Sequence, residues 1–400
     1  MSDTTQIQNQ IKEYIISSNR FNVLEKNIGV ELTKIGGYSN MNYRGIIKDI
    51  STNETIEEVF YRKFGSKFRE FSESVNHELE DFITKYLAQK GYGPKLLYES
   101  PDDYTISEYL INTITLPIEK YFDQNIIEQL CNILSYFTSI SYIYKYKINN
   151  NNIIITKVQD DIKEKKISLN KNLFEKGLSM LENTKPVFDV FISEFKKKYS
   201  KEKNEKEWAD VELVQNHIEN FKKYFIDCFP SQGFFVINHN DVHRQNILFR
   251  EKEQKIFLID HEYFFLNLPG FDIVYYLVEY YINYEPEYFC SLDKIDFDKT
   301  FIYYEKFINQ FIQQNKVIEK EEGGKEFIEI IKTKKYYIYL TNLVNLYLFI
   351  WSIGNVKFEA WDKDHKGEFF FVHGVDRIKF YLAGMNAIKK YEFALNYEFK

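Results

Sequence analysis

The 400-residue chain contains little cysteine and no excess of positive charge. Its three cysteines, Cys131, Cys228 and Cys290, lie far apart and show neither metal-ligand spacing nor a disulfide framework. This usage is typical of a reducing compartment. The formal net charge of −7 argues against a nucleic-acid partner, because such a protein needs a basic face to neutralise phosphates.

Long apolar runs are also missing. The most apolar stretch, Leu343 to Trp351, is far shorter than the roughly 20 residues that cross a bilayer. The first ten residues are polar and contain no apolar segment of a secretion signal. We therefore expect a cytoplasmic protein without a transmembrane segment.

Aromatic residues are abundant instead, with 32 Tyr and 36 Phe. Because Asn, Lys and Ile are common as well, a drift in overall composition explains this excess. No single Tyr or Phe is therefore interpreted as functional from its type alone. The hydrophobic share of 44% and the charged share of 28% are typical of a globular protein.

Up to residue 112, short β-like runs alternate with turns, and one helical stretch interrupts them. The expected strands cover 27–35, 43–50, 58–64, 95–99 and 104–110, and the expected helix covers 71–90. Gly91 to Pro94 end this helix. This order of three strands, a helix and two further strands resembles that of a kinase small lobe.

Beyond residue 113 the pattern becomes mostly helical. We expect one or two amphipathic helices over 120–147, and strands again at 234–237, 247–249 and 255–259. The Lys- and Glu-dense segment 157–222 is interpreted as solvated helices with an inserted loop. The sequence thus predicts an α+β fold with two lobes, 1–112 and 113–400.

One motif suits phosphoryl transfer. His239-Asn240-Asp241 is followed by Asn246, and an apolar run then ends in Asp260. In phosphoryl transfer one carboxylate orients the attacking hydroxyl and accepts its proton, while amide and carboxylate oxygens hold Mg²⁺ against the phosphates. A turn or a cap explains Asp241 or Asp260 alone, but not both at this spacing.

This tract resembles the choline/ethanolamine kinase family. The resemblance rests on His239-Asn240-Asp241, Asn246-Ile247-Leu248, Ile259-Asp260-His261-Glu262-Tyr263 and Gly270-Phe271-Asp272-Ile273. It implies a protein-kinase-like fold with a β-rich N-terminal lobe for ATP and a larger, mostly helical catalytic lobe. Asp241 would then be the catalytic base and contact the substrate, Asn246 and Asp260 would bind Mg²⁺, and Asp272 would brace the catalytic loop.

The resemblance extends to the nucleotide site. Gly36-Gly37-Tyr38-Ser39-Asn40 is similar to the family's phosphate loop, which implies roles for Gly37, Ser39 and Asn40, although Gly-Gly alone more often marks a hairpin turn. Arg62 would neutralise ATP phosphates. Its helix partner would be Glu80, with Glu78 as the fallback. The remaining nucleotide-site residues that the resemblance implies are Glu108, Tyr109 and Leu110, whose backbone would meet adenine, and His243.

The substrate residues come from the same resemblance. Glu279, Tyr284, Trp351 and Phe369 match positions that line the family's choline pocket. A quaternary ammonium cannot donate N–H bonds, so aromatic faces and a nearby carboxylate recognise it. Core packing is the competing interpretation of each aromatic residue. The implied reaction is ATP-dependent phosphorylation of choline or ethanolamine, in phospholipid head-group synthesis, and a homodimer is left open.

Several positions depart from the family pattern. Leu348 stands in place of a tryptophan, His373 of a tyrosine, Pro269 of an arginine and Tyr275 of an asparagine. With His243, the loop resembles that of aminoglycoside phosphotransferases, which carries a histidine at the same position. Two alternatives therefore stay open: a kinase of another small alcohol, and an inactive pseudokinase that binds a partner.

Overall fold

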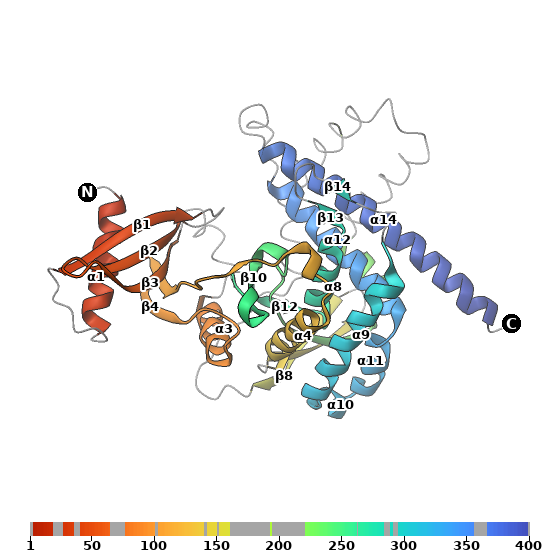
Figure 1. Ribbon diagram of the computed structural model, residues 1–400. Coiled ribbons are helices and arrows are strands. Elements are labelled where there is room, and N and C mark those ends of the chain that lie inside the picture. Colours follow the sequence, from red (N-terminus) through yellow and green to blue (C-terminus); the bar gives the residue numbers. More distant parts are fainter. Residues whose placement is uncertain are drawn as a thin grey trace. The chain divides into compact units, whose positions relative to one another are not determined.

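The chain divides into two compact units (Figure 1). One comprises Met1–Pro117 and Gln245–Glu262, and the other Ile118–Arg244 and Tyr263–Lys400. The predicted functional division at residue 112 stays a prediction. The computed structural model describes residues 3–18, 27–35, 41–64, 77–100, 103–139, 142–149, 152–160, 193, 221–261, 263–283, 289–290, 295–355 and 366–398.

The first unit contains a five-stranded antiparallel sheet in the order β1-β2-β3-β5-β4. Its strands are β1 (Ile28–Ile35), β2 (Met41–Asp49), β3 (Glu54–Lys63), β4 (Leu96–Ser100) and β5 (Tyr104–Glu108). Helix α3 (His77–Lys90) lies between β3 and β4 in the chain. The predicted order of three strands, a helix and two strands is confirmed.

Helix α1 (Asp3–Ser18) packs on this sheet and was not predicted from the sequence. Ile7, Ile11, Tyr14 and Ile15 form one buried face and join a core cluster with the strands. The Tyr14 hydroxyl also donates to Glu57 Oε2 on β3 (3.2 Å). Their spacing of i, i+4, i+7 and i+8 is that of an amphipathic helix, so the sequence did contain the signal for α1.

A second, three-stranded sheet of the first unit has the order β11-β10-β6. Strands β10 (Ile247–Arg250) and β11 (Lys255–Leu258) form a hairpin, and β6 (Ile114–Thr115) pairs with β10. The 3₁₀ helix η4 (Glu251–Glu253) makes the turn. The predicted strands at 247–249 and 255–259 are confirmed, and the open end of the hairpin carries Asn246 and Asp260.

The second unit contains a four-stranded sheet, β12-β9-β7-β8. It consists of β7 (Tyr142–Asn149), β8 (Asn152–Asp160), β9 (Gln232–Asn238) and β12 (Phe265–Asn267). Helix α4 (Gln124–Ser139) confirms the first part of the helix expected over 120–147, but the continuation beyond 141 is wrong. Ile143 and Tyr146 of β7 are buried, and Tyr146 packs on Phe235 of β9 with ring centroids 4.7 Å apart.

Helices make up most of the remaining second unit. They are α7 (Phe221–Cys228), α8 (Phe271–Glu279), α9 (Phe297–Gln314), α10 (Val317–Lys320), α11 (Gly324–Ile331), α12 (Lys334–Asn355) and α14 (Lys366–Glu398). Short pieces complete it: η2 (Ile118–Lys120), η3 (Arg244–Asn246), whose last two residues group with the first unit, and the pair β13 (Ile282–Asn283) and β14 (Phe289–Cys290). Across the described ranges, no helix combines the length and hydropathy of a membrane span. All nine residues of α8 are buried.

Candidate active site

Helix α8 holds the backbone of the loop that follows β9. The Asp272 carboxylate accepts hydrogen bonds from the backbone N–H groups of His239 (2.7 Å) and Asn240 (2.8 Å). Burial raises the pKa of Asp272 to about 7, although these two bonds act in the opposite direction. The contacts are those that the predicted brace of the catalytic loop requires.

Gly270 allows α8 to begin at this place. It caps the helix with φ of 90°, a conformation that favours glycine. A Cβ at this position would lie 2.7 Å from the Tyr304 ring and 3.3 Å from Leu340. Both the dihedral angle and the close packing therefore demand glycine, and the following Asp272 depends on it for its place.

Asn240 holds the same loop through its side chain. Its backbone has φ of 63°, which is unusual for a non-glycine residue. Its amide Nδ2 donates to the carbonyl oxygens of Asn238 (2.8 Å) and Tyr263 (3.0 Å), and its Oδ1 accepts from Asn267 Nδ2 (2.8 Å). Sequence reasoning missed the role of Asn240 and Asn267, because only the fold brings β12 beside the end of β9.

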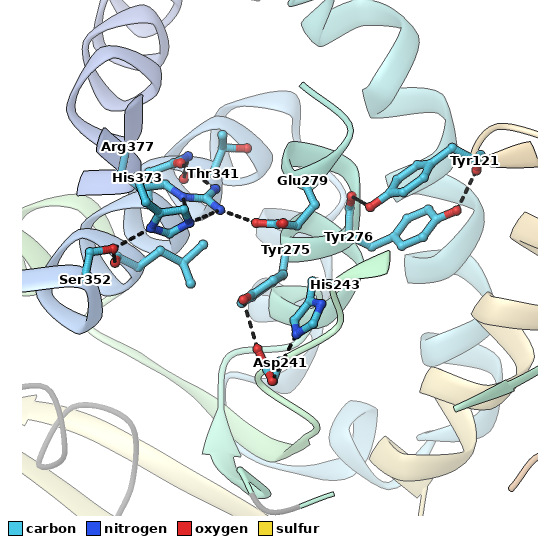
Figure 2. A network of polar contacts seen from close by, with 12 residues as sticks. Tyr121, Asp241, His243, Tyr275, Tyr276, Glu279, Thr341, Ser352, His373 and Arg377 are labelled. Atoms are coloured by element: carbon cyan, nitrogen blue, oxygen red, sulfur yellow. Dashed lines mark hydrogen bonds and ion pairs between the residues drawn. The ribbon is translucent and has the colours of Figure 1, made fainter. Parts of the chain in front are cut away.

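Asp241, the predicted base, is held between two side chains (Figure 2). The Tyr275 hydroxyl of α8 donates to its Oδ1 (3.0 Å), and His243 Nε2 lies 3.5 Å from its Oδ2. Burial tends to raise the pKa of Asp241, but His243, and to a smaller degree His239 and Tyr275, outweigh it and lower this pKa below its ordinary value. The side chain is 20% exposed, so it combines a fixed, ionised carboxylate with access to solvent.

The first unit brings together three further predicted residues. Arg62 on β3 forms an ion pair with Asp260 (Nη2 to Oδ1, 2.6 Å). The Asn246 carbonyl oxygen accepts from the Ile259 backbone N–H (3.0 Å), so Asn246 and Asp260 flank the same hairpin end. Asp260 has φ of 64°.

The chemistry of these side chains fits a magnesium site. Asn246 supplies an amide oxygen and Asp260 a carboxylate, and both come from the open end of one hairpin. Mg²⁺ prefers oxygen ligands and is usually held by one or two carboxylates together with substrate phosphates. Among the described residues, no cluster of three or more His, Cys, Asp or Glu forms a separate metal centre.

A second buried polar network lies at the end of α8 (Figure 2). Glu279 forms an ion pair with Arg377 of α14, whose side chain is 0% exposed. Arg377 also donates to His373 Nε2 (3.2 Å from Nε) and to Asn345 Oδ1 (3.4 Å). His373 Nδ1 in turn contacts Ser352 Oγ. The structure thus places Glu279 opposite an arginine of the same chain, which sequence reasoning did not predict.

His373 is neutral in this network. Burial and the charge of Arg377 lower its pKa well below 6.5. Because Arg377 donates to Nε2, the single proton of His373 lies on Nδ1 and points to Ser352, whose hydroxyl donates to the Leu348 carbonyl (2.7 Å). The Trp351 ring stands edge-on to His373 at 6.1 Å between centroids. Of the predicted substrate residues, Glu279 and Trp351 therefore border one network.

Backbone groups of the segment predicted to meet adenine already form hydrogen bonds within the first unit. The Glu108 backbone N–H donates to the Lys95 carbonyl oxygen (2.8 Å) and that of Tyr109 to the Glu58 carbonyl oxygen (3.2 Å). The Leu110 carbonyl oxygen accepts from the Thr113 hydroxyl (2.7 Å). An adenine contact would consequently use other groups of this segment.

Several predicted site residues lie outside the described part of the chain. These are Gly37, Ser39, Asn40 and Tyr284, together with the side chains of Glu80 and Phe369. Their assignments stay predictions. His243 is described, and its observed partner is Asp241.

The comparisons with known proteins agree with this arrangement. A family model described as choline/ethanolamine kinase matches residues 33–382. The chain belongs to the choline/ethanolamine kinase family. No curated protein matches the chain significantly. The matched residues include α8, the loop of residues 239–243 and the hydrogen-bonded partners of Asp241 and Glu279. The match confirms the resemblance seen in the sequence.

Solved structures of choline kinases share the fold. Choline kinase from Cryptosporidium parvum is 17% identical with a TM-score of 0.62, and the match covers 98% of this chain and 97% of that one. Choline kinase LicA from Streptococcus pneumoniae is 15% identical with a TM-score of 0.52, covering 96% and 99%. At these identities the likeness shows the fold, which is kinase-like, with a sheet-rich N-terminal region and a helical C-terminal region.

Proposed function

We propose that the protein transfers the γ-phosphoryl group of ATP to the hydroxyl of choline or ethanolamine. Asp241 orients this hydroxyl and accepts its proton, Arg62 binds phosphate oxygens, and Asn246 and Asp260 hold Mg²⁺. When bound, Mg²⁺ neutralises charge on the phosphates. The products are ADP and phosphocholine or phosphoethanolamine, which are precursors of phospholipid head groups.

One observation carries this proposal: Asp241 is ionised and held on both of its oxygens. Asp272 bonds the backbone of residues 239 and 240, and Tyr275 and His243 face the carboxylate. A base that is already oriented avoids reorganisation when the alcohol reacts. Family membership supplies the reaction class, and the loop supplies a group able to serve it.

Replacing Asp241 tests the reaction. We expect Asp241→Asn to lower kcat by about 10²- to 10⁴-fold, the usual contribution of a general base, while ATP affinity stays close to that of the wild type. ADP release with each alcohol and fluorescence-monitored nucleotide binding measure the two effects. Asp298→Asn is the matched control, because the Asp298 side chain is 88% exposed on α9. Retention of most activity by Asp241→Asn would contradict the assignment of the base.

A kinase of another small alcohol is the second candidate. The observation that favours it is the buried pairing of Glu279 with Arg377, because this carboxylate is already neutralised within the chain. An alcohol without a cationic head group would then be an acceptable substrate. Measuring kcat/KM for choline, ethanolamine, neutral polyols and an aminoglycoside distinguishes the candidates. A preference of more than about tenfold for a neutral alcohol would overturn the choice of an amino alcohol.

A further inference from the structure

One face of α8 contacts the predicted catalytic loop at two points. Asp272 and Tyr275 are three residues apart and therefore lie on the same side of the helix. Asp272 bonds the backbone N–H groups of His239 and Asn240, and Tyr275 bonds the side chain of Asp241. The helix thus fixes the loop backbone and the carboxylate at the same time.

Tyr275 is itself held firmly. It is only 4% exposed, and its ring packs edge-to-face on Phe271 one turn earlier, with centroids 6.4 Å apart. A phenol has two side-chain torsions and, once its ring is packed, its hydroxyl has a fixed position. A hydrogen bond from this hydroxyl to a carboxylate is charge-assisted, and such bonds are stronger than those between neutral groups.

We infer that Tyr275 is a positioning residue of the phosphoryl-transfer site, whose hydroxyl sets the orientation of the Asp241 carboxylate toward the substrate alcohol. The inference rests on the proposed function and adds a residue to it. It also gives a role to one of the departures noted in the sequence, because the tyrosine hydroxyl at 275 lies 3.0 Å from Asp241 Oδ1. Tyr275 acts through Asp241 and takes no proton from the substrate.

The charge environment of Asp241 indicates what removal of the hydroxyl should do. His239 and His243 face the carboxylate from its own loop, Asp272 and Tyr275 from α8, and Tyr347 from α12. Of these, the Tyr275 hydroxyl donates a hydrogen bond that favours the ionised form of Asp241. Without it the carboxylate loses a fixed orientation and binds protons more readily.

Tyr275→Phe tests the inference, and Tyr276→Phe is its matched control. Tyr276 is the next residue on α8 and is 0% exposed, and its hydroxyl donates to the Tyr121 carbonyl oxygen (2.6 Å), away from Asp241. Each variant removes one buried hydroxyl from the same helix. Thermal unfolding is recorded for both, and kcat is expressed per mole of ATP-binding protein, so that misfolded protein does not imitate a slower reaction.

We expect Tyr275→Phe to lower kcat about tenfold, the loss that follows removal of a hydrogen bond to a charged group. KM for the alcohol and the affinity for ATP should stay unchanged, and the acidic limb of the kcat/KM profile should move to higher pH. Tyr276→Phe should keep the wild-type kcat and pH profile. This pattern would support a positioning role, because a purely structural defect does not move the acidic limb.

Two outcomes would overturn the inference. One is a Tyr275→Phe enzyme with the wild-type kcat and pH profile in a preparation where Asp241→Asn is inactive; the proposed function would then survive. The other is an equal loss of kcat in the two tyrosine variants, which indicates a general defect of α8. Absence of ADP formation by the wild type with every alcohol would reject the proposed function and the inference with it.

Discussion

Two ion pairs in this protein involve predicted functional carboxylates, and they differ in their surroundings. Arg62 and Asp260 in the first unit have side chains that are 14% and 33% exposed. Arg377 and Glu279 in the second unit are 0% and 2% exposed, and His373 and Asn345 also contact the arginine. The first pair keeps partial contact with solvent, and the second is buried in the core.

This difference in exposure indicates that one ion pair is suited to ligand binding and the other to structural stability. Partly exposed ion pairs contribute about 0–1 kcal/mol to stability, so Arg62 and Asp260 can exchange each other for a phosphate or a metal ion at small cost. In a buried pair, removal of one partner leaves an uncompensated charge in the core and costs about 3–5 kcal/mol. We therefore expect the first pair to serve ligands and the second to hold α8 against α14.

The largest expected effect is that of Arg377→Met. It leaves Glu279 and the acceptor atom of His373 without their arginine, and we expect the free energy of unfolding to fall by about 3–5 kcal/mol. Chemical denaturation measures this. Lys306→Met is the control, because its pair with Glu128 is 39% and 47% exposed and should contribute little to stability. A similar loss in both variants would remove the distinction between the two pairs.

The pH dependence of stability sharpens the same contrast. His373 has a folded pKa well below 6.5, so the unfolded chain binds more protons at acidic pH. The stabilising effect of the buried, neutral His373 on the folded protein is complete above pH 6.5, and it is lost as the pH falls below that value. We expect the wild type to lose about 1 kcal/mol more than His373→Gln between pH 7.5 and pH 5.5, measured by denaturation at each pH. Parallel curves for the two proteins would contradict a neutral, buried His373.

The smallest effect on stability is expected for Arg62→Gln. The free energy of unfolding should change by less than about 1 kcal/mol, whereas ATP affinity and kcat fall together, because the variant loses a phosphate contact. Lys48→Gln, which breaks a surface pair with Glu31 in the same sheet, should leave both kinetic quantities unchanged. A strongly destabilised Arg62→Gln protein with normal nucleotide affinity would show that this pair is structural too.

The sequence predicted the order of strands and helix in the first unit and the hairpin over 247–259, because short apolar runs bounded by turn residues are local signals. It missed α1, although the spacing of Ile7, Ile11, Tyr14 and Ile15 is that of an amphipathic helix. It also extended a helix into β7, where Tyr144 and Tyr146 pair with β9, and a strand of this kind is explained only by what it packs against.

For the candidate site, the sequence predicted the carboxylates that carry the chemistry, but it did not predict the side chains that contact them. Asp241, Asp260 and Asp272 follow from a motif with fixed spacing. The contacts of Tyr275, Asn267 and Arg377 do not follow from it, because each of these residues meets its partner across 27 or more positions of the chain. The departure at residue 275 was visible as a missing asparagine, but only the fold shows that the new side chain reaches Asp241.

The glycine at 270 gives a last consequence. Asp272, Tyr275 and Glu279 are spaced along one rigid helix that starts from it, so a methyl group added at 270 would displace the whole helix against Tyr304 and move all three contacts together. Such a displacement would weaken all contacts of the helix at once, so a second substitution at one contact could not restore them. We therefore expect a single added carbon atom at Gly270 to abolish activity, although this residue does not contact a ligand.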